Sequence, residues 1–205
     1  MPVATAGRAC EAPPPGTTFV DTPPSAALVE QLAILRRPQT AEDLAAIDRL
    51  GTLPLGRVHR SGVRVAHAAD GRSYVLYPST ARRPASRRCR GDVPWPPVHR
   101  ISVFTEQPDG TFGGGGLYSA GRLRTYADGF GSFGGGPGGE PTILYALVRD
   151  GVARVTWVFQ GGLRATGVVQ DNIAAGEIAA GPLGLRLERT IYEAADGTIL
   201  ADVEA

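Results

Sequence analysis

The feature that most constrains the fold of this chain is the stretch of residues 141–176, PTILYALVRDGVARVTWVFQGGLRATGVVQDNIAAG. Its first segment, residues 143–148, is continuously apolar, as expected of a strand that is covered on both faces. The dipeptide Asp150-Gly151 follows, and it suits the positive φ angles of a tight hairpin turn. The stretch therefore begins with a predicted buried strand and a predicted turn.

Beyond this turn, apolar residues alternate with polar ones, which is the period of a β-strand. Gly161-Gly162 interrupts the alternation and offers a second two-residue turn. Three strands joined by two tight turns form an antiparallel meander, and we predict this meander as the core of the fold. One face of the two later strands collects Val155, Trp157, Phe159, Leu163, Ala165, Gly167 and Val169, and the other collects Arg154, Thr156, Val158, Gln160, Arg164, Thr166, Val168 and Gln170.

The same period of two recurs on both sides of the meander. VRVAHAA and RSYVLYP flank Asp70-Gly71, and LGLRLERTIYEAA and TILADVE flank Asp196-Gly197, so each pair predicts a hairpin. HRISVFTEQ predicts a further strand, whereas residues 78–97 have the composition of a loop. Residues 110–140, with GGGG at 113–116, predict a flexible excursion between strands. Residues 52–205 thus predict a mainly antiparallel β-domain, a meander or sandwich with about seven or eight strands.

Two short amphipathic helices are predicted ahead of this domain, in residues 25–51. The first begins at Ser25 and stops at Pro38, and the second begins at Thr40, where Asp43 resembles the acidic partner of a capping box. We expect this arm to pack on the β-domain. Residues 1–24 contain PPP and PP and predict an extended linker or arm, with an unstructured tail as the alternative. The apolar stripes are Leu28, Leu32 and Leu35 in the first helix and Leu44, Ile47 and Leu50 in the second, with Gly51 as its cap.

Composition excludes several classes of function. Apolar residues make up 42 % of the chain, enough for a core, and the formal net charge of +1 gives no field that would recruit nucleic acid. All 21 cationic residues are arginine, so chemistry that needs a lysine, such as a Schiff base or a P-loop, is excluded. No apolar run is long enough to span a bilayer, so we expect no integral membrane protein.

The two cysteines, Cys10 and Cys89, are compatible with one disulfide that closes a long loop, and two reduced thiols are the alternative. The N-terminal residues lack the apolar segment of a signal peptide. The protein is therefore either cytosolic or the mature form of a secreted precursor. We expect the second, an extracytoplasmic protein.

No motif assembles a catalytic, cofactor or metal site. Residues 129–134 match GxGxxG, but the GGPGGE that follows cannot open the helix on which a dinucleotide site depends. His59, His67 and His99 have none of the spacings typical of zinc ligands, and His67 is in phase with a predicted strand. We therefore predict no catalytic residue, no cofactor and no metal, and we interpret His67 as a hydrogen-bonded histidine of a sheet.

The chain has one dense cluster of charge, in residues 82–90. Guanidinium groups in such number could hold a phosphate, a sulfated sugar or an acidic partner. A solvated basic loop is the alternative, because charge runs are usually surface features and no aromatic residue is interleaved before Trp95. The candidate anion-binding residues are Arg82, Arg83, Arg87, Arg88 and Arg90.

Three segments together resemble a known group of proteins. ILRRPQTAEDL, SVFTEQPDGTFGGG and ILYALVRDGVARVTW with VVQDNIAAG are similar to segments of uncharacterised actinobacterial proteins that look secreted or attached to the envelope. Those proteins carry "LRRPQTA" before a β-rich body with "VYGLVPDGV" and "VRDNV". This chain departs from the pattern at Arg149, which replaces a proline, and at Cys89. The resemblance implies a domain held outside the membrane and names no reaction.

Two functions from different classes are compatible with these observations. The first is a non-enzymatic extracytoplasmic domain that binds a protein or an envelope component. The second is a hydrolase or carbohydrate-active domain whose site is built from loops, with His99, Trp95 and a carboxylate. We favour the binding domain, since no catalytic set is assembled in the sequence.

Overall fold

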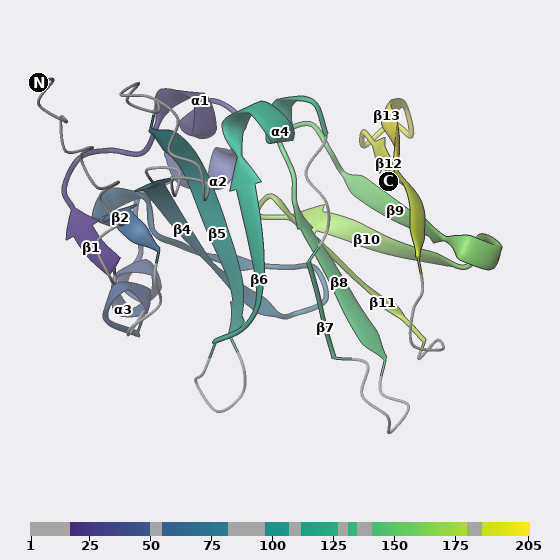
Figure 1. Ribbon diagram of the computed structural model, residues 1–205, viewed down its shortest axis with the longest axis horizontal. Coiled ribbons are helices and arrows are strands. Elements are labelled where there is room, and N and C mark those ends of the chain that lie inside the picture. The colour runs from purple at the N-terminus through teal and green to yellow at the C-terminus, as the bar shows by residue number, and fades with distance from the viewer. Residues whose placement is uncertain are drawn as a thin grey trace, which may run out of the picture.

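The structure is a computed structural model that describes residues 17–49, 55–81, 97–106, 112–126, 131–134, 141–179 and 186–205. Two sheets, called A and B here, make up most of these residues (Figure 1). In Figure 1 sheet A lies on the left and sheet B on the right, and α1, α2 and α4 lie at the upper end. The mainly β, mostly antiparallel architecture predicted from the alternation of residues is confirmed.

Sheet A has the strand order β1-β2-β4-β5-β6, and β3 also pairs with β4. Its ladders are antiparallel except the one between β1 and β2, which is parallel. The hairpin predicted around Asp70-Gly71 is confirmed as β3 and β4, and Gly71 supplies a φ of 85°. The strands are β1 (Thr17–Val20), β2 (Gly56–His59), β3 (Arg64–His67), β4 (Ser73–Ala81), β5 (Val98–Glu106) and β6 (Phe112–Ser119).

Sheet B has the order β13-β12-β9-β10-β11-β8-β7, and all its ladders are antiparallel. The hairpins predicted around Gly161-Gly162 and Asp196-Gly197 are confirmed as β9–β10 and β12–β13. Residues 143–148 are all buried, as their apolar run predicts. The strands are β7 (Gly131–Gly134), β8 (Thr142–Leu147), β9 (Arg154–Phe159), β10 (Arg164–Gln170), β11 (Ile173–Ile178), β12 (Leu187–Glu193) and β13 (Ile199–Glu204).

The predicted meander is wrong in one connection. Gly151 does turn, with a φ of 89°, but β8 does not pair with β9. Instead β8 pairs with β11, so β8 to β11 follow the order of a Greek key. The link between β8 and β9 crosses the end of the β10–β11 hairpin, where Val148 N donates to Asn172 O (2.8 Å) and Val169 N donates to Ala153 O (3.0 Å). The dipeptide Asp150-Gly151 correctly predicted a turn of the chain, but it did not predict which strand pairs with β8.

Two glycines permit a close approach of β10 and β11. Gly167 and Gly176 adjoin Val168 and Ala175, which lie opposite each other on these two strands. A Cβ atom at Gly167 would lie 2.8 Å from the carbonyl oxygen of Ala175, and one at Gly176 would lie 2.6 Å from that of Thr166. No side chain fits between these backbones, so the pair can approach only with glycine at both positions.

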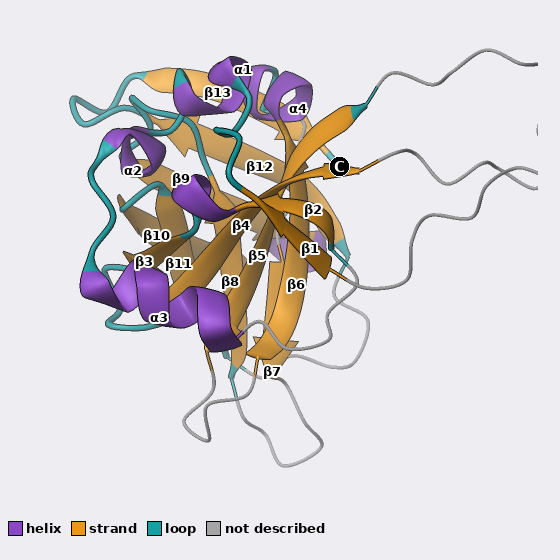
Figure 2. Ribbon diagram, turned by 90° about the vertical axis from the view of Figure 1, so that its left-hand side faces the viewer, coloured by secondary structure: helices purple, strands orange, loops and turns teal. Residues whose placement is uncertain are grey.

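Three hydrophobic clusters hold the layers together. The first lies between the sheets and contains residues of β4, β5 and β6 together with β8 and β11. The second lies on the other face of sheet B, away from the first cluster, and contains Trp157, Phe159 and Tyr192. The third packs α3 onto the outer face of sheet A through Ile47, Val58 and neighbouring residues (Figure 2). The residues of each cluster are therefore buried by other parts of the same chain.

The helices differ from the predicted pair. Leu28, Leu32 and Leu35 are buried as predicted, but their single helix is broken in two at Leu32, whose backbone is extended. Asp150 causes the break, because its N–H donates to Gln31 O (2.8 Å) and its carboxylate accepts from Ala33 N (2.7 Å). The helices of the described residues are α1 (Ala26–Val29), α2 (Ala33–Arg36), α3 (Ala41–Arg49) and α4 (Ala120–Arg124).

The strand count also differs, since the described residues hold thirteen strands and not seven or eight. β6, α4 and β7 lie within the glycine-rich segment predicted as a loop, and β4 continues to Ala81 within the predicted loop 78–97. β1 lies in the segment 1–24 that was assigned to a linker or arm. Main-chain hydrogen bonds to a neighbouring strand need no side chain, so a sheet can hold strands whose own sequences carry no alternation.

Candidate functional site

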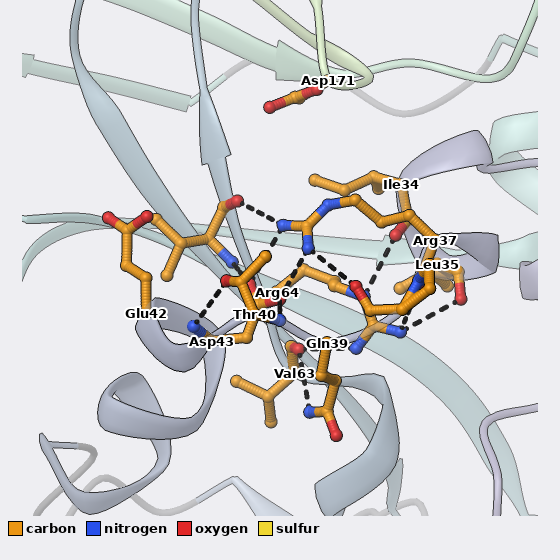
Figure 3. A network of polar contacts seen from close by, with 12 residues as sticks. Ile34, Leu35, Arg37, Gln39, Thr40, Glu42, Asp43, Val63, Arg64 and Asp171 are labelled. Carbon is orange, nitrogen blue, oxygen red and sulfur yellow. Dashed lines mark hydrogen bonds and ion pairs between the residues drawn. The ribbon is translucent and has the colours of Figure 1, made fainter.

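Asp43 is the centre of a polar network between α3 and sheet A (Figure 3). Its side chain is fully buried, and Arg37 binds it through two nitrogens, at 2.6 and 3.0 Å. The main-chain N–H groups of Thr40 and Val65 donate to the same carboxylate at 2.7 and 2.6 Å. Burial alone would raise the pKa of Asp43, but these hydrogen bonds outweigh burial and hold the pKa below its usual value. Asp43 N also donates to Thr40 Oγ1 (3.2 Å), so the predicted capping box is confirmed.

Arg64 lies beside this network and is almost fully buried, at 4 % exposure. Burial lowers its pKa from the usual value. Its guanidinium donates only to main-chain carbonyl groups, so it closes the end of α2 onto β3 and has no nitrogen left for a ligand. The accepting oxygens are those of Ile34, Leu35, Arg37, Ser61 and Val63, at 2.7–3.3 Å.

Asp150 and Asn172 form a second junction, between α2 and sheet B. Asp150 accepts from Arg36 (2.5 Å) and from the Asn172 side chain (2.9 Å). Asn172 also accepts from Ile34 N (3.0 Å) and donates to Val148 O (3.0 Å). Its φ of 63° is left-handed, a conformation that asparagine tolerates better than most residues. Burial opposes these bonds, yet they hold the pKa of Asp150 below its usual value.

These two junctions contain residues from the segments on which the predicted family resemblance depends. LRRPQTAED supplies Arg36, Arg37 and Asp43, and the two later segments supply Asp150 and Asn172. Each of these polar side chains bonds to another part of the chain. We therefore interpret these segments as the joints that attach the helices to the two sheets.

A chain of hydrogen bonds at one end of sheet A joins two of the three histidines. His59 Nδ1 lies 2.9 Å from the carbonyl oxygen of Thr22, which can only accept, so Nδ1 carries the hydrogen. Nε2 of the neutral ring then accepts from the Thr80 hydroxyl at 2.8 Å. The Thr80 oxygen accepts in turn from His99 Nδ1 at 3.0 Å. This order leaves His99 Nε2 as an acceptor in the neutral state.

The opposite face of the same strands carries Arg100 and Ser79. Arg100 on β5 lies directly across from Ser79 on β4, so the two side chains share a face. Arg100 is half-buried, and its Nε atom is buried without a hydrogen-bond partner. The Ser79 side chain is 1 % exposed, and its hydroxyl also lacks a partner. The fold thus places a cation and a hydroxyl group on one face of the sheet, and the described residues supply no hydrogen-bond partner for Arg100 Nε or Ser79 Oγ.

Other candidates from the sequence have different outcomes. His67 is hydrogen-bonded to Ser73 (3.1 Å) and to Glu42 (3.1 Å), as predicted of a sheet histidine, although it is exposed. Trp95 and the remaining candidates lie outside the described residues, so the disulfide and the arginine cluster stay predictions. These remaining candidates are Cys10, Cys89, Arg82, Arg83, Arg87, Arg88 and Arg90.

Sequence reasoning did not identify Arg100 or Ser79. The alternation of HRISVFTEQ places Arg100 on one face of a strand, but the sequence does not indicate which strand lies opposite. The composition of residues 78–97 predicts a loop, so the sequence does not place Ser79 and Thr80 in a sheet. The missing signal was strand pairing, which depends on contacts distant in the sequence.

The described residues offer neither a metal site nor a membrane-spanning helix. They contain no group of three or more histidine, cysteine, aspartate or glutamate residues that could hold a metal ion. None of the helices that the structure describes is long and apolar enough to cross a membrane. Between the sheets, burial raises the pKa of Tyr145 to about 12, which keeps this phenol protonated at neutral pH.

Comparisons with protein-family models, with curated proteins and with solved structures found no match to this chain. The resemblance to actinobacterial envelope proteins is therefore still a prediction.

Proposed function

We propose that this chain is a non-enzymatic, extracytoplasmic binding domain of the cell envelope that recognises an anionic group on its partner through Arg100. The observation that carries the proposal is the half-buried guanidinium of Arg100, for which the described residues provide no hydrogen-bond or ion-pair partner. The partner is a protein or an envelope component that presents this anionic group.

The physical reason is the cost of burying an unpaired charge. Arginine does not lose its proton in proteins, so Arg100 keeps its charge although burial lowers its pKa from the usual value. A buried cation is normally paired with an acid, because removing it from water otherwise costs free energy. A bound anion would supply that missing pair and form charge-assisted hydrogen bonds.

The position of the arginine cluster in the sequence agrees with this site. Residues 82–90 belong to the connection between β4 and β5, the two strands that carry Ser79 and Arg100. A long-range attraction of the partner by these arginines would precede its capture at Arg100.

The extracytoplasmic location is supported by the proline-rich N-terminus and by the family resemblance. Mass spectrometry of the native mature protein tests it, since the true N-terminus and the redox state of Cys10 and Cys89 are read together. An intact initiator methionine with two free thiols would contradict the location.

Retention on an immobilised sulfated polysaccharide tests the binding function. We expect Arg100→Gln to elute at clearly lower NaCl concentration than the wild type. Arg57→Gln is the matched control, since it removes the same charge from an exposed position on β2 of the same sheet. Equal elution of the two variants would show that only net charge matters and would contradict the proposal.

A hydrolase is the second candidate, and the hydrogen-bond chain through Thr80 favours it. The chain holds His99 with Nε2 as an acceptor, the state of a general base, and uses His59 and Thr80 in place of the predicted carboxylate. In this case His99→Gln abolishes hydrolysis of an activated ester or glycoside that the wild type cleaves. His67→Gln is the control, and equal rates in both variants, or no wild-type hydrolysis, would reject this candidate.

A further inference from the structure

One row of residues crosses the five consecutive strands β1-β2-β4-β5-β6 of sheet A and passes through the proposed site. Opposing positions of neighbouring strands are Phe19 and Val58, Val58 and Ser79, Ser79 and Arg100, and Arg100 and Ser119. Since directly opposed residues share a face, the row is apolar on β1 and β2 and polar on β4, β5 and β6. Arg100 therefore has a serine on each side.

The other neighbours of Arg100 on this face are neutral as well. Residues two positions away along a strand point to the same side, and two positions from Arg100 lie Val98 and Ser102. Tyr77 and Leu117 are the corresponding neighbours that oppose Ser102 on β4 and β6. No carboxylate occupies any of these positions, so the register of the sheet gives Arg100 hydroxyl groups and no acid.

The N–H groups of Arg100 and the hydroxyl of Ser79 approach a ligand from different directions, and this geometry indicates which anion fits. The Nε edge of a guanidinium presents two parallel N–H groups in one plane, which match two oxygens of a carboxylate, phosphate or sulfate. Ser79 adds a donor from a different strand, and its buried hydroxyl has no partner. A carboxylate has both oxygens engaged by the guanidinium, whereas a tetrahedral oxyanion has further oxygens that can reach the hydroxyl.

We infer that Arg100 and Ser79 form a binding site for a tetrahedral oxyanion, a phosphate or sulfate group, and that Ser79 distinguishes this group from a carboxylate. The inference rests on the proposed function, because it names the chemical class of the anion that Arg100 recognises. The site selects by geometry, with the guanidinium providing charge and the serine hydroxyl providing the third hydrogen bond.

Isothermal titration of the full chain with inorganic phosphate, sulfate and acetate, at constant ionic strength set by NaCl, tests the site. We expect phosphate and sulfate to bind and acetate to bind more weakly. Arg100→Gln should abolish binding of all three. Ser79→Ala should weaken phosphate and sulfate binding by about tenfold, the usual effect of losing one hydrogen bond to a charged group, and leave acetate binding unchanged.

Unfolding of the ligand-free variants gives an independent readout. Ser79→Ala removes a buried hydroxyl that has no partner, so this variant should be as stable as the wild type or more stable. If Ser79 served only to stabilise the fold, Ser79→Ala would be less stable than the wild type. The combination of unchanged or increased stability with weaker oxyanion binding is therefore specific to a ligand-binding role.

The outcomes separate this inference from the function on which it rests. If acetate binds as tightly as phosphate and Arg100→Gln abolishes both, the anion-binding function stands and the oxyanion site is wrong. If no anion binds, both are wrong. Full oxyanion affinity in Ser79→Ala also overturns the site. Cosedimentation with phosphatidylglycerol vesicles that depends on Arg100 would identify a lipid headgroup as the source of the bound phosphate. Absence of cosedimentation would identify a phosphate or sulfate group that does not belong to a lipid.

Discussion

Asp43 shows how a single carboxylate can join two parts of the chain. It receives two hydrogen bonds from Arg37 and two from main-chain N–H groups, and one of these, from Val65, belongs to β3. The carboxylate therefore starts α3 and fixes that helix to sheet A with the same two oxygens. Arg37 also donates to Val65 O (2.9 Å), which closes the connection from the other side.

Replacing this carboxylate should be costly. We expect Asp43→Asn to lower the free energy of unfolding by about 3–5 kcal/mol, because it leaves Arg37 without its acid and breaks a buried pair. Glu42→Gln is the neighbouring control, whose side chain is 47 % exposed and pairs with His67, and it should change stability by less than about 1 kcal/mol. Denaturant unfolding measures both, and equal losses would contradict the assigned role of Asp43.

The pH dependence of stability follows from the same bonds. A carboxylate whose pKa is lower in the folded state than in the unfolded state stabilises the fold at neutral pH, and this contribution is lost as pH falls through the folded value. Asp43 and Asp150 are both of this kind. We expect stability to fall below about pH 5 and the fall to be smaller in Asp43→Asn. Denaturant unfolding at each pH measures the free energy of unfolding of the wild type and of Asp43→Asn. Curves of this free energy against pH that run parallel for the two proteins would contradict the prediction.

At the scale of elements, the close approach of β10 and β11 depends on two glycines. The backbones at Gly167 and Gly176 lie so close together that neither position has room for a Cβ atom. The obstacle to a side chain at either position is backbone, which cannot move aside as a flexible side chain would.

Alanine at either glycine should therefore be destabilising. We expect Gly167→Ala and Gly176→Ala each to lower the free energy of unfolding by about 1–3 kcal/mol, the usual cost of overpacking. Gly121→Ala in α4 is the control, because a Cβ atom there meets nothing within 4 Å, and it should be neutral or stabilising by up to about 1 kcal/mol. Unfolding curves that rank Gly121→Ala with the other two would show that the close approach is absent.

Sequence patterns predicted elements better than they predicted neighbours. Alternation located β9, β10 and their buried face because it depends only on one strand being half-buried. It did not show that β8 pairs with β11, since a turn dipeptide fixes a local direction and leaves the pairing partner open. Leu44, predicted in the apolar stripe of α3, is 51 % exposed, because α3 instead buries Asp43, Ala46 and Ile47.

At the scale of the molecule, the N-terminal helices belong to the core. Leu28, Leu32, Ile34 and Leu35 lie in the cluster between the sheets, beside Tyr145 and Ile173 of sheet B. An ion pair between Arg72, on the loop from β3 to β4, and Glu177 of β11 connects the two sheets directly. The segment predicted as an arm thus fills the same interior that the sheets enclose.

This shared interior predicts cooperative unfolding. We expect Leu32→Ala to lower the stability of the whole chain by about 2–5 kcal/mol, as for other buried leucines, with coincident transitions in circular dichroism and tryptophan fluorescence. Leu44→Ala, at an exposed position, should cost about 0.5 kcal/mol or less. Separate transitions in the Leu32 variant would show that the helices unfold independently of the sheets.

The candidate site was the least accessible to sequence reasoning. The arginine cluster at 82–90 is compatible with an anion site or with a solvated basic loop, whereas Arg100 lies inside an ordinary strand pattern. Arg100 becomes a candidate only because β4 and β6 place a serine on each side of it. This register depends on how the strands pair in the assembled sheet. Isolated motifs could not have shown it.

The Greek-key order has a consequence for synthesis of the protein on the ribosome. β8 leaves the ribosome before β9, β10 and β11, yet one of its partners, β11, is the last of the four to emerge. Its apolar residues therefore stay unpaired on that side while about thirty more residues are translated, a period of seconds at ordinary elongation rates. During that interval residues 143–148 present an unpaired apolar strand edge, a feature that favours aggregation and the binding of a chaperone.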